Sequence, residues 1–245
     1  TYVAAPDRDI LIYVISDRTD SSAFGVAWYQ GPADLDRIVN RLQNRGFPRT
    51  DVMDEVDLAE MDAATLSHYL QIWLVEGDGD RSIDVTAAER DLLLQFYSTG
   101  RGVWISSEND MDRPYISYGM PETNLSWYED ANFLMQGFGV DNPGDMILTG
   151  DVTYSYNHPE LFRRIDWLSF NGEIGRLTST NPAIQWVLTF TKASDGPDAP
   201  AGTYTGMGIL DERASGAGRA VFDSGWVLGY AFYRLHPGDD NRRFC

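Results

Sequence analysis

The chain has 245 residues, of which 43% are hydrophobic and 13% aromatic, so it can bury the core of one large domain. Its 37 acidic residues outnumber the 19 basic ones, and the net charge of -18 argues against nucleic acid and anionic membrane surfaces as partners. No apolar run approaches the roughly 18 residues of a membrane span. The one cysteine, Cys245, excludes a disulfide within the chain and a cysteine nucleophile inside the fold.

The first part of the chain reads as a strand followed by a helix. Residues 10–15 are a continuous hydrophobic strand, and residues 34–45 carry apolar side chains at helical spacing before Gly46, a favourable residue just past a helix end. Residues 50–53 are expected to form a short strand. Residues 62–69 are expected to form a helix that Asp62 caps.

The pattern then repeats with a clearer helix. Residues 71–75 read as a buried strand, and Thr86 with Glu89 three positions later forms the capping-box arrangement at the start of a helix. Residues 103–106 then return to the sheet. Right-handed crossovers would make the successive strands parallel neighbours, so the sequence predicts an α/β fold.

The periodicity weakens after this strand. Residues 108–142 are rich in aromatics, Gly, Pro and Asn, which predicts an irregular insertion beside the sheet with one helix around residues 127–135. Later strands are expected at residues 184–190, 204–209 and 219–222. With no internal repeat, residues 1–245 are interpreted as a single domain.

Several segments resemble a known superfamily. The segment TAAERDLLLQFYSTGRGVWISSEND (residues 86–110) resembles a helix and strand of the class I glutamine amidotransferase-like superfamily, especially the non-catalytic domains of large secreted bacterial proteins. The segments YLQIWLVEGDGD, NHPELFRRIDWLSFNG and GRAVFDSGWVLGYAF are similar to an earlier strand, an "HP" segment and a late strand of that group. The resemblance implies a flavodoxin-like three-layer sandwich with a mostly parallel sheet, and fold alone assigns no activity.

An amidotransferase places a cysteine on a sharp turn between a strand and a helix and pairs it with histidine. Here the corresponding turn holds Ser106 and Ser107, without the small flanking residues that such a turn needs. Hydrolysis of glutamine is therefore not expected. The enzymatic alternative is a serine hydrolase that uses Ser107 or Ser106 with His158 and Glu160, although the His-Pro-Glu tripeptide reads more simply as the structural "HP" segment of the superfamily.

Acidic residues follow three of the expected strands. Because the carboxyl ends of parallel strands share one edge of a sheet, these carboxylates can converge there. Such a group would suit Ca²⁺ or Mg²⁺, which prefer oxygen ligands. The alternative is that each carboxylate points separately into water. The candidate metal ligands are Asp17, Glu76, Asp78, Asp80 and Glu108.

The insertion also offers an interaction surface. Exposed aromatic rings among polar neighbours suit contact with protein or carbohydrate, because they supply large area at little entropic cost. The more ordinary interpretation is that the rings cover one end of the sheet. The residues concerned are Tyr115, Tyr118, Trp127, Tyr128, Phe133 and Phe138.

These observations favour a catalytically silent structural or binding module. The acidic composition and the presence of Lys192 as the only lysine among 19 basic residues suit an extracellular or cell-surface protein. A protein partner or self-association is expected, with carbohydrate as another ligand class. No cofactor is required, and Ca²⁺ or Mg²⁺ is the ion that the acidic edge would take.

Overall fold

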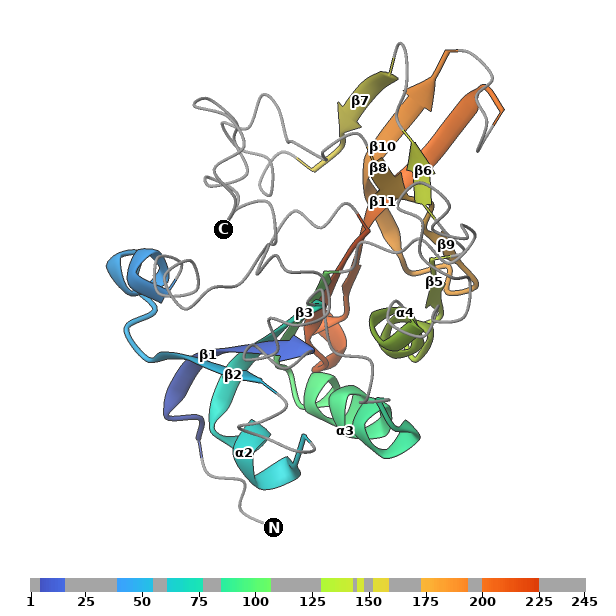
Figure 1. The fold of residues 1–245 in the computed structure, drawn as a ribbon. Helices are drawn as coiled ribbons and strands as arrows, with labels where there is room; N and C mark the ends of the chain where they lie inside the picture. Colours follow the sequence, from blue (N-terminus) through green and yellow to red (C-terminus); the bar gives the residue numbers. More distant parts are fainter. Residues whose placement is uncertain are drawn as a thin grey trace, which may run out of the picture.

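A computed structural model of the chain describes residues 5–15, 39–54, 61–76, 85–106, 129–142, 145–147, 152–158, 173–193 and 200–224. An eight-stranded sheet forms the centre of these residues (Figure 1). Its strands are β1 (Arg8–Ile15), β2 (Thr50–Asp54), β3 (Tyr69–Glu76), β4 (Gly102–Ser106), β7 (Val152–Tyr156), β10 (Gln185–Lys192), β11 (Gly202–Asp211) and β12 (Arg219–Asp223). None of the described helices is long and apolar enough to cross a membrane.

The strand order of this sheet is β2-β1-β3-β4-β12-β11-β10-β7. The first five strands are parallel to one another, and the order β2-β1-β3-β4-β12 is the 2-1-3-4-5 order of flavodoxin-like sheets. The last three strands add an antiparallel extension. The predicted α/β fold with a mostly parallel sheet is therefore confirmed, and the antiparallel extension is an addition to it.

Smaller elements accompany the sheet. Two short ladders pair β5 (Val140–Asp141) with β9 (Thr178–Ser179) and β6 (Asp145–Ile147) with β8 (Glu173–Gly175). The helices are α2 (Ala63–Ser67), α3 (Ala87–Ser98), α4 (Glu129–Gln136) and the 3₁₀ turn η3 (Arg213–Ser215), and residues 39–44 are also helical.

The helix ends follow local sequence rules. The Thr86 hydroxyl accepts a hydrogen bond from the Glu89 amide while the Glu89 carboxylate accepts from the Thr86 amide, so the predicted capping box is present at the start of α3. The Asp62 carboxylate caps α2 as expected. The chain after residues 39–44 turns at Gly46, whose φ of 105° is the left-handed conformation that glycine adopts readily.

One predicted boundary was wrong. The helix that Asp62 caps ends at Ser67 rather than at residue 69, and Tyr69 begins strand β3. Tyr69 is buried, and its hydroxyl donates a hydrogen bond of 2.8 Å to the Asp51 carboxylate on β2. This tertiary contact holds Tyr69 in the sheet, where helical periodicity alone would have extended the helix.

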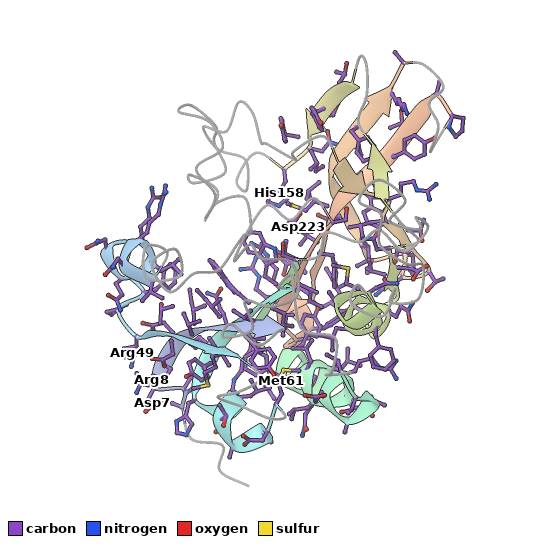
Figure 2. All side chains as sticks on the ribbon, viewed as in Figure 1. Asp7, Arg8, Arg49, Met61, His158 and Asp223 are labelled. Atoms are coloured by element: carbon purple, nitrogen blue, oxygen red, sulfur yellow. The ribbon has the colours of Figure 1, made fainter. Side chains whose placement is uncertain are left out.

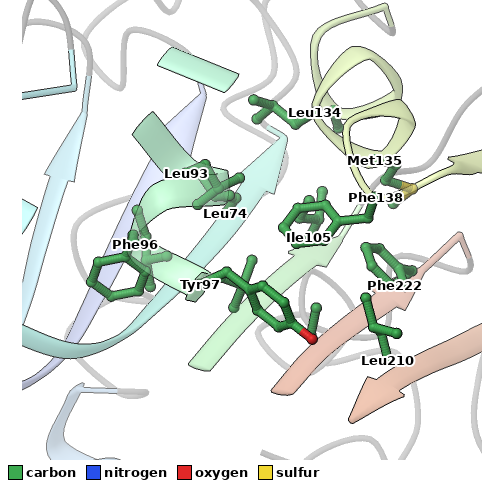
Figure 3. Close-up of a cluster of buried hydrophobic side chains, with 14 of the residues drawn as sticks. Leu74, Leu93, Phe96, Tyr97, Ile105, Leu134, Met135, Phe138, Leu210 and Phe222 are labelled. Atoms are coloured by element: carbon green, nitrogen blue, oxygen red, sulfur yellow. The ribbon is translucent and has the colours of Figure 1, made fainter. Parts of the chain in front are cut away.

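The main core lies between one face of the sheet and helices α3 and α4 (Figure 3). Phe138 sits at its centre, with ring centroids 5.3 Å from those of Tyr97 and of Phe222. The labelled core residues are Leu74, Leu93, Phe96, Tyr97, Ile105, Leu134, Met135, Phe138, Leu210 and Phe222. Helix α4, which falls within the predicted insertion 108–142, is thus part of the main core.

The opposite face of the parallel strands is buried too. Ile10, Ile12 and Val14 alternate with the core-facing residues of β1 and are fully buried. Leu42 of the helical residues 39–44 is buried outside the main core, and Figure 1 shows this helical segment apart from α2, α3 and α4. Burial of both faces is typical of parallel sheets with helices on two sides.

The antiparallel extension differs from the parallel strands because one of its faces is partly exposed. Its partly exposed face carries hydroxyl side chains in two rows across β7, β10 and β11. One row is Ser155, Thr189 and Thr205, and the other is Thr153, Thr191 and Thr203. The hydroxyls of Thr191 and Thr203 lie 2.9 Å apart. Cross-strand threonine pairs of this kind stabilise a sheet face that meets water.

Candidate functional site

The strand register brings the ends of four parallel strands to one edge. Ile15 of β1 pairs with Glu76 of β3, and Ser106 of β4 pairs with Asp223 of β12. Val75, one residue before Glu76, pairs with Ser106. The carboxyl edge of a parallel sheet is where ligands of flavodoxin-like folds usually bind, so this edge is the candidate site.

Ser106 and Asp223 form a direct pair at this edge. The Ser106 hydroxyl donates a hydrogen bond of 2.9 Å to Oδ2 of Asp223. Both residues are 0% exposed. A carboxylate removed from water needs hydrogen-bond donors, and Ser106 supplies one from the neighbouring strand.

Ser224, the residue after β12, joins this pair to the rest of the sheet. Its hydroxyl lies 2.9 Å from the carbonyl oxygens of Gly175 and Gly206, to which it can donate. The Gly175 amide in turn donates to the Ser224 carbonyl at 2.9 Å. Ser224 therefore ties the end of β12 to β8 and β11 and is fully buried there.

Two asparagines complete a group that we name the buried polar cluster: Ser106, Asn132, Asn142, Asp223 and Ser224, each at most 2% exposed. The main-chain N–H of Asn142 donates to Oδ1 of Asn132 at 2.8 Å, which links α4 to the residue after β5. A Cβ atom on Gly175 would lie 2.6 Å from both the Asn142 side chain and the Cβ of Ser224. The packing therefore requires glycine at position 175.

The opposite, amino edge of the parallel strands is charged. Arg49 donates to the Asp9 carboxylate at 2.9 Å, and this hydrogen bond is the main reason why the pKa of Asp9 lies below its usual range. Arg8 lies 3.4 Å from the Asp51 carboxylate. Figure 2 shows Arg8 and Arg49 together, far from Asp223 in that view. These pairs tie β1 to β2 and leave the candidate site at the other edge.

The predicted catalytic residues are only partly described. Ser106 lies in the buried polar cluster, and Ser107 and Glu160 lie outside the described residues. His158 follows β7, the fourth strand from β4 in the sheet order. Tyr156 stands in the row that contains Asp223 and Ser106, so about 19 Å separates Tyr156 from Ser106 along the sheet. The described residues show no hydrogen bond between Ser106 and His158.

The predicted metal ligands lie mostly outside the described residues. Glu76 is the last residue of β3, whereas Asp17, Asp78, Asp80 and Glu108 belong to segments that the structure does not describe. Within the described ranges, no three His, Cys, Asp or Glu side chains gather as a metal site would require. The Ca²⁺ or Mg²⁺ site stays a prediction.

Two of the predicted interaction residues are described. Phe138 is 5% exposed and belongs to the main core, so its ring covers the sheet and offers no contact surface. Phe133 is half-buried on α4, where the Arg90 guanidinium lies 4.4 Å from the centroid of its ring. Tyr115, Tyr118, Trp127 and Tyr128 lie outside the described residues.

Sequence reasoning missed most of the buried polar cluster. Asp223 and Ser224 directly follow the apolar residues of β12, which is the same pattern that pointed to acidic residues after the earlier strands. Applied to this strand, that pattern would have found them. Asn132 and Asn142 carry no comparable signal, because only the packing of α4 against the sheet brings them to this edge.

No protein-family model matches the chain, and no curated protein does. Among solved structures, a ThuA-like protein from Bacteroides uniformis is similar at 13% identity, with 91% of this chain and 84% of that chain covered and a TM-score of 0.49. The mmIFT52 N-terminal domain is similar at 13% identity, with 88% and 85% covered and a TM-score of 0.48. The exo-β-1,4-mannosidase Op5Man5 from Opitutaceae bacterium strain TAV5 matches 92% of this chain with 32% of its own, at 13% identity and a TM-score of 0.41. Similarities this low assign no activity.

Proposed function

We propose that this domain is a non-catalytic structural or binding module of an extracellular or cell-surface protein, and that it associates with a protein partner or with itself. The observation that carries the proposal is the state of Ser106. This serine occupies the end of β4, where the superfamily that the sequence resembles carries its cysteine nucleophile.

A nucleophile must reach its substrate and be activated by a base. Ser106 has no exposed surface, and its hydroxyl proton is directed to Asp223. The chain has no cysteine before Cys245. Both features favour a scaffold in which the serine at the end of β4 is buried and hydrogen-bonded within the fold.

The alternative hydrolase would use Ser107 or Ser106 with His158 and Glu160. Assays of glutamine hydrolysis and of p-nitrophenyl acetate cleavage, with Ser107→Ala and Ser106→Ala variants alongside the parent chain, separate the two functions. We expect all three proteins to turn over neither substrate above the rate of buffer. Turnover by the parent chain that Ser107→Ala or Ser106→Ala abolishes while the variant stays folded would replace the proposal with the hydrolase.

Self-association is tested by sedimentation velocity over a range of protein concentrations. We expect the mean mass to rise with concentration, and the double variant Trp127→Ser/Tyr128→Ser to remain monomeric because it lacks two of the predicted contact rings. Leu70→Ser is the matched control, since Leu70 is an exposed hydrophobic residue outside that region. A monomer at every concentration would remove self-association from the proposal and leave only a foreign partner.

A further inference from the structure

Lys192 is an electrostatic anomaly. This residue, the only lysine of the chain, is the last residue of β10 and is 2% exposed. Within the part of the chain that the structure describes, its Nζ has no hydrogen-bond partner. An ammonium group withdrawn from water without an acceptor is strongly unfavourable, so a buried cation normally occurs with a partner.

The two residues directly opposite Lys192 in the sheet supply no acceptor side chain. The register places it opposite Gly202 on β11 and Val152 on β7, neither of which has a polar side-chain atom. The next residue on the same face of β10 is Phe190, whose ring is fully buried and stacks on that of Tyr204 at 5.7 Å. The Tyr204 hydroxyl already donates to the Pro200 carbonyl at 2.8 Å.

Three arginine side chains of the protein, by contrast, have hydrogen-bond acceptors. Arg101, which is also partly buried, donates to the carbonyl oxygens of Leu66 and Ser67 at 3.2 and 3.1 Å. Arg49 has the Asp9 carboxylate, and Arg213 has the Asp211 carboxylate. In a chain with 37 acidic residues, carboxylates are abundant. Among the described residues, Lys192 therefore differs from these arginines because its ammonium group has no hydrogen-bond acceptor.

We propose that Lys192 anchors an anion-binding site at the outer end of the antiparallel extension, which takes a carboxylate or phosphate group of a small ligand. An ammonium group presents three donors from one compact charge, which suits the oxygens of such an anion. Phe190 and Tyr204 provide an apolar wall beside it. Lys192 lies four residues beyond Leu188, which shares the row of Asp223, and β10 is two strands from β12. This site therefore lies roughly 13 Å along the strands and about 10 Å across the sheet from Asp223 of the buried polar cluster. The proposal is independent of the proposed function.

Because Lys192 is the only lysine, lysine labelled with ¹³C at Cε places a single probe in the protein. We expect titration with inorganic phosphate or with acetate to shift this Cε resonance saturably, and the anion that saturates at the lower concentration identifies the preferred acid group. At a hundred times the half-saturating concentration, Tm should rise by about 5–10 °C for a chain of this size.

The variant Lys192→Met keeps the length of the side chain and removes its charge, so the anion-dependent rise in Tm should disappear. Arg45→Met removes an exposed cation and should keep the rise. The inference is overturned if neither anion moves the Cε resonance saturably, or if Lys192→Met keeps the rise in Tm. If Lys192→Met fails to fold, the titration of the Cε resonance in the parent chain is by itself the test of anion binding.

Discussion

At the scale of single residues, the hydrogen bond from Ser106 to Asp223 is the buried contact that joins the ends of β4 and β12. Replacing Ser106 with alanine removes one donor from a fully buried carboxylate. We expect Ser106→Ala to lower the free energy of unfolding by about 1–3 kcal/mol, as is usual when a buried acceptor loses its donor. Urea unfolding measures the loss.

The control for this substitution is Ser98→Ala, because Ser98 is exposed at the end of α3 and its hydroxyl bonds only to a carbonyl one turn back. The control should stay within about 0.5 kcal/mol of the parent chain. Equal stability of Ser106→Ala and the parent chain would show that the bond to Asp223 contributes nothing to the free energy of unfolding.

Asp211 offers a test of pH dependence. Arg213 and Arg219 both donate to its carboxylate, at distances of 2.6–3.0 Å. The hydrogen bond from Arg213 is the largest cause that holds the pKa of Asp211 well below its usual range, and Arg219 adds to it against the opposing effect of partial burial. Because the folded state lowers this pKa, the pairs stabilise the protein above the ordinary pKa of aspartate and lose their effect as the pH falls toward the folded value.

We therefore expect Asp211→Asn to cost at most about 1 kcal/mol at pH 6, where both arginines face the ionised carboxylate. The difference between parent chain and variant should shrink as the pH falls below about 4. Urea unfolding of both proteins at a series of pH values measures it. A difference that stays constant over this range would mean that the ionised form of Asp211 is not what stabilises η3 and β12.

At the scale of elements, the turn between η3 and β12 contains two glycines with different requirements. A Cβ atom on Gly218 would lie 1.8 Å from the Arg101 carbonyl oxygen, and the Gly218 amide donates to the Tyr97 carbonyl at the end of α3. Gly216 has a φ of 95°, and a Cβ atom at this position would meet no other atom within 4 Å. Glycine at 218 permits a close approach of two chain segments, whereas glycine at 216 permits only a turn.

Substitution by alanine should separate these roles. We expect Gly216→Ala to cost about 1–2 kcal/mol, the penalty of a left-handed conformation for a residue with a Cβ atom. Gly218→Ala should reach or exceed the upper end of the about 1–3 kcal/mol typical of overpacking, because rigid backbone must move. Thermal unfolding of the two variants measures this order, and the reverse order would mean that the loop and β4 are not packed as described.

The strands and helices of the parallel part of the sheet followed from local sequence, whereas the strands β5 to β9 were not predicted. The capping box of α3 and the Asp62 cap of α2 are local signals, since the residues involved lie within three positions of one another. Strand β7 was not predicted, although Thr153 to Tyr156 alternate hydroxyl and tyrosine side chains and turn residues such as Gly150 and Asn157 flank the strand. It exists as a strand because β10 offers it a partner.

At the scale of the whole molecule, the net charge of -18 sets the response to ions. If the acidic residues after β1, β3 and β4 converge as predicted, Ca²⁺ or Mg²⁺ should raise Tm saturably at constant ionic strength, and the rise should weaken in Asp78→Asn and Glu108→Gln. Asp91→Asn, at an exposed position on α3, is the control that should keep the rise.

Sodium chloride at matched ionic strength distinguishes the site from general screening of the repulsion among carboxylates. A rise in Tm that sodium chloride reproduces in full would contradict a specific divalent site. A rise limited to one divalent ion would identify the ion that the edge prefers.

The sequence by itself determined the α/β class, the strands of the parallel sheet and their helices, because each depends on periodicity, caps and turn residues over a few positions. It also excluded a cysteine nucleophile. The antiparallel extension with β7, the core position of Phe138 and the start of β3 at Tyr69 depended on packing between distant segments.

Tertiary structure alone decided the state of the candidate site. Ser106 and Asp223 are 117 positions apart, and only the parallel pairing of β4 with β12 turns an apparent nucleophile position into a buried hydrogen bond. The burial of Lys192 likewise follows from its place at the end of β10, beside a glycine on β11. The register of the strands brings together residues that are far apart in the sequence and that no local pattern connects. Which side chains lie beside one another at each edge of the sheet is therefore decided only when the strands pair.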